Sequence, residues 1–317
     1  MIKKVLITGG LGYIGGRISS FLSKSKLYQL SIGTRDVQQA KPDWLSNGQL
    51  VNIELLDQDK LEEACSEIHS VIHLAATNEN ESVTNPVQAL NINSLGSLKL
   101  LHAAINAGVE RFIYISTAHV YGSPLAGTLT ESSLTRPQHP YAITHKTAED
   151  FILAAHDKGK INSVVLRLSN GYGCPERANV NRWTLLVNDL CKQAVTAGKL
   201  VLNSSGIQAR DFITLEDVSR AVEHVLNMPE RDISDGLFNL GGENPLKIID
   251  MAEKIVERSN EVLNLKLEIE RPESGIGETS LNLDYCIDKL KLTGYTLKSN
   301  HTEEIDNTLM FCNKVFS

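Results

Sequence analysis

The chain has 317 residues, of which 42% are hydrophobic and 22% charged, so it has the composition of a globular protein with a substantial core. A net charge of −7 argues against a nucleic-acid-binding surface, because such surfaces depend on clustered Lys and Arg. The five cysteines form no CxxC pair and no apolar run reaches the roughly 18 residues of a membrane span, so we expect a cytoplasmic protein without membrane contact.

Short apolar runs alternate with longer amphipathic stretches through the first half of the chain, which is typical of βα units that build a parallel sheet. Strands are predicted at residues 4–8, 28–33, 50–55, 70–76, 111–116 and 163–169. Helices are predicted after the first strand and at residues 86–107 and 141–157. These elements predict an α/β fold whose residues 1–170 form a Rossmann-like dinucleotide-binding domain with a doubly wound parallel sheet.

The pattern changes after residue 170, where glycine and proline interrupt the chain before helices predicted at 184–197 and 215–228. We expect residues 171–317 to form a smaller α/β substrate-binding portion at the C-terminal side, with a segment of about residues 212–230 returning to the first domain. Because open α/β sheets bind ligands at the carboxyl ends of their strands, this portion is expected to cover that edge.

The segment TGGLGYIGG, residues 8–16, follows the first predicted strand and opens a helix. Gly9 and Gly12 would let the backbone turn and approach a pyrophosphate, and Gly15 would let the helix pack closely on the sheet. The amide groups and the dipole at the start of such a helix attract phosphate. The segment therefore predicts a dinucleotide-binding loop in preference to a plain glycine-rich turn.

The end of the second predicted strand, IGTRD, bears on the choice of dinucleotide. In this fold an acidic residue at that point holds the ribose of NAD, whereas an arginine accommodates the 2′-phosphate of NADP. Thr34 and Arg35 stand where the acid is expected, and a guanidinium pairs well with phosphate, so NADP is favoured over NAD. The alternative is that Arg35 is a solvated loop charge and Asp36 holds the ribose.

Eight short motifs occur along the chain in a recognisable order: TGGLGYIG, HLAA (73–76), NSLGS (93–97), YISTAHVYG (114–122), PYAITH, RLSNGYG (167–173), RDFITLEDV (210–218) and FNLGG (238–242). By these motifs the sequence resembles the extended short-chain dehydrogenases/reductases, in particular the nucleotide-sugar epimerases, dehydratases and reductases. The similarity extends over nearly the whole chain. It implies hydride transfer between a sugar carbon and a nicotinamide, with a nucleotide sugar as the substrate.

In this resemblance Tyr141 is the acid/base that moves the hydroxyl proton, and Thr117 supplies the hydroxyl that hydrogen-bonds the reacting oxygen. A phenol with a pKa of about 10 is a poor base at neutral pH unless a cation lies nearby. The family places a lysine four residues after the tyrosine, but this chain has His145 there and Lys146 one position later. Glu149 lies eight residues after the tyrosine, as it does in the family, so the segment is aligned correctly with the family's motif and the lysine is absent from its expected position.

Three interpretations of His145 stay open. The histidine could replace the lysine, because a neutral ring can still hydrogen-bond the nicotinamide ribose and a protonated ring would also supply charge. Lys146 could instead reach the site through a local distortion of the helix. Finally, Tyr141 could be weakly activated, which would leave the protein slow or non-catalytic.

The resemblance also assigns the remaining contacts. The cofactor site would comprise Gly9, Gly12, Tyr13, Ile14, Gly15, Thr34, Arg35, Leu74, Ala75, Ala76, Asn93, Tyr141 and His145. The substrate would contact Thr117, His119, Asn170 and Arg210, with Arg210 on the diphosphate. No set of His, Cys, Asp and Glu has the spacing of zinc ligands, so no catalytic metal is implied.

The residues after Thr117 bear on the type of reaction. In this family the 4,6-dehydratases carry an Asp-Glu pair there, because eliminating water needs both an acid and a base. Ala118 and His119 occupy those positions, so we expect reduction of an NDP-4-keto-6-deoxyhexose in the synthesis of activated sugars for polysaccharide. The alternatives are an NDP-hexose 4-epimerase and a catalytically weak dinucleotide- or sugar-nucleotide-binding protein.

Residues 91–107 and 141–157 resemble the helices of the family's dimer interface, so a homodimer is expected.

Overall fold

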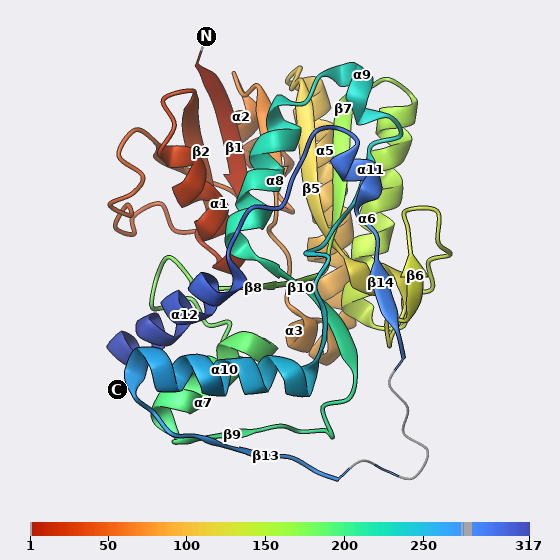
Figure 1. Cartoon of the computed structure of the whole chain (residues 1–317). Coiled ribbons are helices and arrows are strands. Elements are labelled where there is room, and N and C mark those ends of the chain that lie inside the picture. Colours follow the sequence, from red (N-terminus) through yellow and green to blue (C-terminus); the bar gives the residue numbers. More distant parts are fainter. Residues whose placement is uncertain (1, 274, 276–280) are drawn as a thin grey trace.

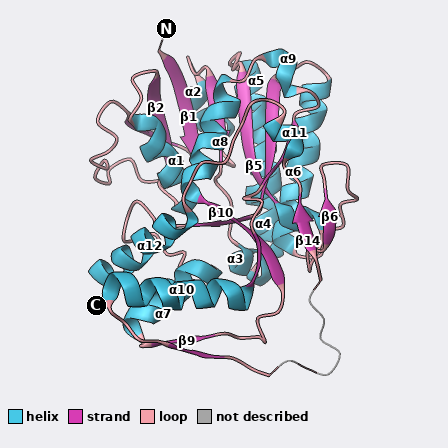
Figure 2. Ribbon diagram, viewed as in Figure 1, coloured by secondary structure: helices cyan, strands magenta, loops and turns pink. Residues whose placement is uncertain are grey.

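The computed structural model describes residues 2–273, 275 and 281–317, and a parallel sheet of seven strands forms its centre (Figures 1 and 2). The strands lie in the order β11-β7-β5-β4-β1-β2-β3. Their bounds are β1 (Lys3–Thr8), β2 (Tyr28–Thr34), β3 (Gln49–Asn52), β4 (Ser70–His73), β5 (Arg111–Thr117), β7 (Asn162–Leu168) and β11 (Leu237–Leu240). The chain runs outward from β1 to β3 and then outward from β4 to β11 on the other side, so the predicted Rossmann-like, doubly wound α/β fold is confirmed.

Strand β11 is the element of the sheet that the sequence prediction omits. It has four residues, lies between Gly236 and Gly241, and pairs in parallel with β7 at the edge of the sheet. The sheet thus takes a strand from beyond residue 230, outside both the 1–170 range and the returning segment expected for the dinucleotide-binding domain.

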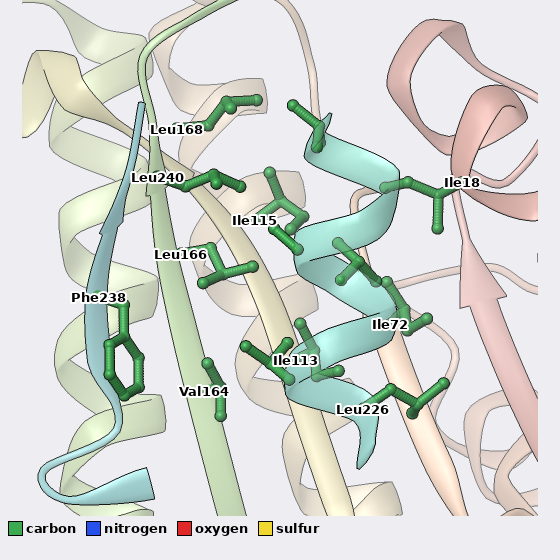
Figure 3. Packing of buried hydrophobic residues seen from close by; sticks show 14 of the residues in the cluster. Ile18, Ile72, Ile113, Ile115, Val164, Leu166, Leu168, Leu226, Phe238 and Leu240 are labelled. Carbon is green, nitrogen blue, oxygen red and sulfur yellow. The ribbon is translucent and has the colours of Figure 1, made fainter. Parts of the chain in front are cut away.

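Helices cover both faces of the sheet, and the inner strands are apolar on both sides as a result; all seven residues of β5 are buried. On one face, α1 (Tyr13–Ser23) packs over β1 and β2, and α8 (Leu215–Asn227) packs over the middle of the sheet, where Ile72, Ile115 and Leu166 lie beside it (Figure 3). Two short helices lie near this side, α9 (Glu230–Ile233) and α11 (Asp288–Lys291). The other face is covered by α2 (Gln58–Cys65), α5 (Ser97–Asn106) and α6 (Pro140–Asp157).

The helix predicted at residues 86–107 is divided into three pieces. It consists of α4 (Pro86–Ala89), a π-helix η1 (Leu90–Gly96) and α5, and it follows α3 (Glu79–Thr84). A side chain at Gly96 would come within 2.9 Å of the Leu55 Cβ atom, so the glycine allows this helix to pack closely. The π-helical segment carries Asn93 and lies against α6 beside the predicted active site, a common place for such segments.

The smaller portion lies beyond the carboxyl ends of the sheet strands (Figure 1). Its core is formed mainly by three mutually packed helices, α7 (Leu186–Thr196), α10 (Ile248–Leu263) and α12 (His301–Phe316). Its strands are β8 (Asn170–Tyr172), β10 (Ala209–Thr214) and β12 (Pro245–Lys247) in one sheet, and the pair β9 (Lys199–Val201) and β13 (Glu268–Glu270). A further pair, β6 (Gly127–Leu129) and β14 (Leu283–Tyr285), packs against the core of the main sheet. An ion pair of 2.7 Å between Arg17 Nη1 and Glu304 Oε1 joins α1 to α12. None of the described helices has the length and apolarity needed to cross a membrane.

Candidate active site

A cleft of about 660 Å³ opens at the carboxyl ends of the sheet strands and is bounded on its other side by the smaller portion. This volume is in the range of small-molecule binding sites. Every predicted cofactor or substrate residue lines the cleft except Thr34 and Asn93. Those that do are Gly9, Gly12, Tyr13, Ile14, Gly15, Arg35, Leu74, Ala75, Ala76, Thr117, His119, Tyr141, His145, Asn170 and Arg210.

The glycine loop between β1 and α1 forms one wall of the cleft. Gly9 has a φ of +68°, and a Cβ atom there would lie 2.9 Å from the Ala75 amide nitrogen, while a Cβ atom at Gly15 would overlap the Gly9 carbonyl oxygen. Gly12 is the N-cap of α1 and supplies no side-chain cap, so the first amides of the helix remain for a ligand. The loop therefore has the shape and the donors of an anion-binding turn.

The three side chains at the end of β2 differ in their orientation. Arg35 is exposed, lines the cleft and forms no ion pair or hydrogen bond with another residue in the described part of the chain. Asp36 does not line the cleft, and its Oδ1 atom accepts a hydrogen bond of 3.0 Å from the Gln38 amide. The Thr34 Oγ1 atom accepts a bond of 2.8 Å from Gln39 Nε2, so this residue stabilises the turn and not the cleft wall. Only the guanidinium is thus available to a ligand.

Tyr141 lies in the first turn of α6, where His139 caps the helix by accepting a hydrogen bond from the Tyr141 amide. The ring of Tyr141 faces that of His145, with 4.3 Å between the ring centroids. Its hydroxyl forms no hydrogen bond with any described residue. Burial raises the pKa of Tyr141, and the Glu79 carboxylate raises it further. The phenol of Tyr141 therefore keeps its proton at neutral pH.

His145 is buried, and its two ring nitrogens have different environments. Nδ1 lies 2.7 Å from the hydroxyl of Tyr114, whereas Nε2 is enclosed without a hydrogen-bond partner among the described residues. Burial lowers the pKa of His145 to about 4, so the ring is neutral at physiological pH. Helix α6 is continuous, and Lys146 pairs with Asp150 and does not line the cleft, so Lys146 does not take the place of the missing lysine.

Thr117 ends β5 at the floor of the cleft. Its Oγ1 atom accepts a hydrogen bond of 3.2 Å from the His119 amide, which leaves the hydroxyl proton for a ligand. Ala118, the next residue, is buried, and His119 lines the cleft. Burial, together with the charge of Arg210, lowers the pKa of His119, so this side chain is an uncharged polar group in the wall.

Two predicted substrate residues come from the smaller portion. The Asn170 side chain donates a hydrogen bond of 2.9 Å from Nδ2 to the Asp211 carbonyl, which leaves its own amide oxygen toward the cleft. Arg210 lies on β10 and forms no ion pair with any residue that the structure describes. A half-buried guanidinium without an acidic partner is suited to a phosphate group.

The comparison with known proteins agrees with this geometry. The model of the NAD dependent epimerase/dehydratase family matches residues 5–241, which include all seven strands of the sheet apart from the start of β1. The chain belongs to this family. The dTDP-D-glucose 4,6-dehydratase of Mus musculus is 29% identical over 272 residues, which cover 80% of this chain and 72% of the relative. The UDP-glucose 4-epimerase of Azospirillum brasilense is 28% identical over 289 residues, covering 85% of this chain and 81% of the relative.

Among solved structures, the UDP-N-acetylglucosamine 4-epimerase from Methanobrevibacter ruminantium M1, in complex with UDP-N-acetylmuramic acid, superposes with a TM-score of 0.83. It is 24% identical, and the match covers 98% of each chain. The predicted resemblance is thus confirmed at the level of the NAD dependent epimerase/dehydratase family, among whose members the relatives named above are nucleotide-sugar dehydratases and epimerases.

Two features of the cleft fit the dinucleotide that the epimerase/dehydratase family uses. Side chains at Gly9 and Gly15 would collide with the backbone of Ala75 and Gly9, so glycine at both positions permits the tight turn that leaves the first amides of α1 open to a pyrophosphate. The buried Nε2 atom of His145 has no protein partner, as expected for a group whose partner is a hydroxyl of the bound ligand. When bound, the nicotinamide supplies or accepts a hydride.

Asn93 and Thr34, predicted to touch the cofactor, lie behind the cleft. The Asn93 Oδ1 atom accepts a hydrogen bond of 2.8 Å from the Thr77 amide, and Nδ2 donates one of 3.0 Å to Thr144 Oγ1. Asn93 therefore ties the loop after β4 to α6, which carries Tyr141.

Two further residues of the cleft, Glu79 and Arg182, belong to no motif that the sequence shows. They line the cleft and form an ion pair of 3.2 Å.

Proposed function

We propose that this member of the epimerase/dehydratase family reduces the keto group of an NDP-4-keto-6-deoxyhexose, with Tyr141 as the proton donor. The observation that supports this direction is the contact of Tyr141 with a neutral histidine where the family has a lysine. A phenol whose pKa is raised by burial stays protonated, and carbonyl reduction needs the protonated acid. A 4-epimerase must first use the same residue as a base, which the raised pKa of Tyr141 disfavours.

In the proposed reaction the Thr117 hydroxyl donates a hydrogen bond to the carbonyl oxygen. Tyr141 donates its proton to the same oxygen as negative charge develops there, and the hydride that a bound nicotinamide would supply to the carbonyl carbon completes the change from ketone to hydroxyl. Arg210 binds the diphosphate, and Asn170 and His119 contact the rest of the substrate. Ala118 and His119 offer no carboxylate pair for elimination of water, the pair that the family resemblance leads us to expect in a 4,6-dehydratase.

The test is to incubate the purified protein with NADPH and an NDP-4-keto-6-deoxyhexose. We expect loss of NADPH absorbance matched by formation of the NDP-6-deoxyhexose. Interconversion of UDP-glucose and UDP-galactose without added cofactor would instead identify a 4-epimerase, the activity named for the Azospirillum relative. Binding of NADPH and nucleotide sugar without either reaction would identify a binding protein.

We further propose NADP as the cofactor, supported by the unpaired Arg35 guanidinium at the cleft and by the engagement of Asp36 in its own turn. The Arg35→Gln variant is expected to bind NADPH roughly 10- to 100-fold more weakly, because it loses a charge-assisted hydrogen bond to the 2′-phosphate. Its affinity for NADH should stay within about twofold, and Asp36→Asn is the matched control that should change neither. Tighter binding of NADH than of NADPH by the unaltered protein would contradict the proposal.

We also propose a homodimer formed through α6 and the helices beside it. Ile143 and Phe151 are exposed on the outer side of α6, with 45% and 46% of their surface accessible, and Val87 and Leu90 are exposed on the adjacent α4 and η1. Such apolar surface is typical of an interface. Light scattering should give twice the chain mass, and Phe151→Glu should shift the protein to the monomer. A monomeric mass for the unaltered protein would contradict the proposal.

A further inference from the structure

Tyr114 does not line the cleft, yet it contacts the residue that replaces the family's lysine. It lies on β5 with 2% of its surface exposed, and its hydroxyl is 2.7 Å from His145 Nδ1. The two rings are stacked, with 5.7 Å between centroids and an interplanar angle of 28°. His145 is thus held between Tyr114 on the strand and Tyr141 at the cleft.

The polar groups next to Tyr114 are satisfied by one another. Ser97 Oγ donates to the Asn93 carbonyl at 2.5 Å, so it accepts from His73 Nε2 at 2.8 Å. The Nδ1 atom of the neutral His73 ring then accepts a hydrogen bond of 2.6 Å from the Thr8 hydroxyl. This directed chain runs from β1 through β4 to the π-helix. The Tyr114 hydroxyl also interacts with Ser97, but Ser97 Oγ already accepts a hydrogen bond from His73, and the free imidazole nitrogen of His145 is the stronger acceptor for the Tyr114 proton.

The contact between Tyr114 and His145 therefore has a preferred direction. A phenol is a stronger donor than a neutral imidazole N–H, so the Tyr114 hydroxyl donates to Nδ1 and the ring proton of His145 resides on Nε2. Nε2 is the atom that is buried without a partner, on a residue that lines the cleft. The charged or titratable groups that act on His145 are Glu79, His73 and the two tyrosines.

We propose that Tyr114 is a positioning residue that fixes the orientation and the tautomer of His145, so that Nε2–H is presented to the cleft as a neutral hydrogen-bond donor for an oxygen of the bound dinucleotide. The choice of ligand rests on the proposed function. Tyr114 and His145 together provide the hydrogen bond that a lysine would give, but they do not provide the positive charge of a lysine.

The first test measures the tautomer directly and needs no ligand. In ¹⁵N NMR spectra of the histidine side chains, with the His145 signals identified from a His145→Gln spectrum, we expect the proton on Nε2. The Tyr114→Phe variant should show a mixture of both tautomers at His145, whereas Tyr295→Phe, which removes a buried hydroxyl bonded to the Asp217 carbonyl, should not change it. A proton on Nδ1 in the unaltered protein would overturn the inference.

The second test separates positioning from a loss of packing. Tyr114→Phe is expected to weaken NADPH binding roughly three- to tenfold. In a His145→Lys background the same change should alter NADPH affinity by less than about twofold, because the ammonium group needs no tautomer. An equal loss in both backgrounds would show that Tyr114 acts only through packing. If the unaltered protein bound no NADPH, the proposed function would fail while the tautomer measurement still decided the role of Tyr114.

Discussion

Replacing Tyr141 with phenylalanine is expected to lower kcat for carbonyl reduction by roughly 10²- to 10⁴-fold, the usual contribution of a positioned general acid. The effect should be this large because Tyr141 lines the cleft and its raised pKa keeps the phenol protonated. Steady-state kinetics with NADPH and the keto sugar nucleotide measure the change.

The binding of NADPH to the Tyr141→Phe variant should be nearly unchanged, because a phenylalanine ring keeps the contact with the His145 ring at 4.3 Å. Thr117→Val is a useful companion, since it removes an orienting hydroxyl from the same floor of the cleft and should lower kcat by less. If Tyr141→Phe retained its turnover, another group would have to donate the proton, and the proposed assignment of the acid would be wrong.

The fold could be predicted because its signals are local and repeated. Six apolar runs separated by helical stretches gave the strands from β1 to β5 and β7, and the glycine segment after the first of them marked the ligand edge of the sheet. Strand β11 could not be identified in the same way. It is a four-residue run, and what makes it a strand is pairing with β7, about 70 positions earlier in the chain.

The residues of the candidate site also fall into two groups, those that occur in local sequence motifs and those that only the tertiary structure brings together. Tyr141, His145 and the glycines occur in short motifs, so the resemblance to a known family could assign their roles before the structure was known. Glu79 and Arg182 come from segments more than 100 residues apart and meet only through tertiary structure. The same holds for Tyr114, whose place in a buried strand predicts a core residue; its hydroxyl becomes informative only when His145 is found beside it.

The second large effect is expected from His145→Lys, measured in the direction of alcohol oxidation. A positive charge about 5 Å from the phenol, at an effective dielectric constant of about 20, lowers the pKa of Tyr141 by roughly 2 units. Oxidation uses the deprotonated phenol, so at pH 7 its rate should rise by up to about 100-fold, and the rising limb of the pH profile should move to lower pH by roughly 2 units. Reduction, which uses the protonated form, should change by only a few-fold.

His145→Gln and Lys146→Met separate the possible causes of such a change. Glutamine keeps a neutral donor, so its oxidation profile should stay close to that of the unaltered protein, whose His145 is already neutral above a pKa of about 4. Lys146 is paired with Asp150 outside the cleft, so removing its charge should leave the profile in place. An unchanged profile in His145→Lys would mean that charge at this position does not control Tyr141, and the argument for a reductase over a 4-epimerase would lose its basis.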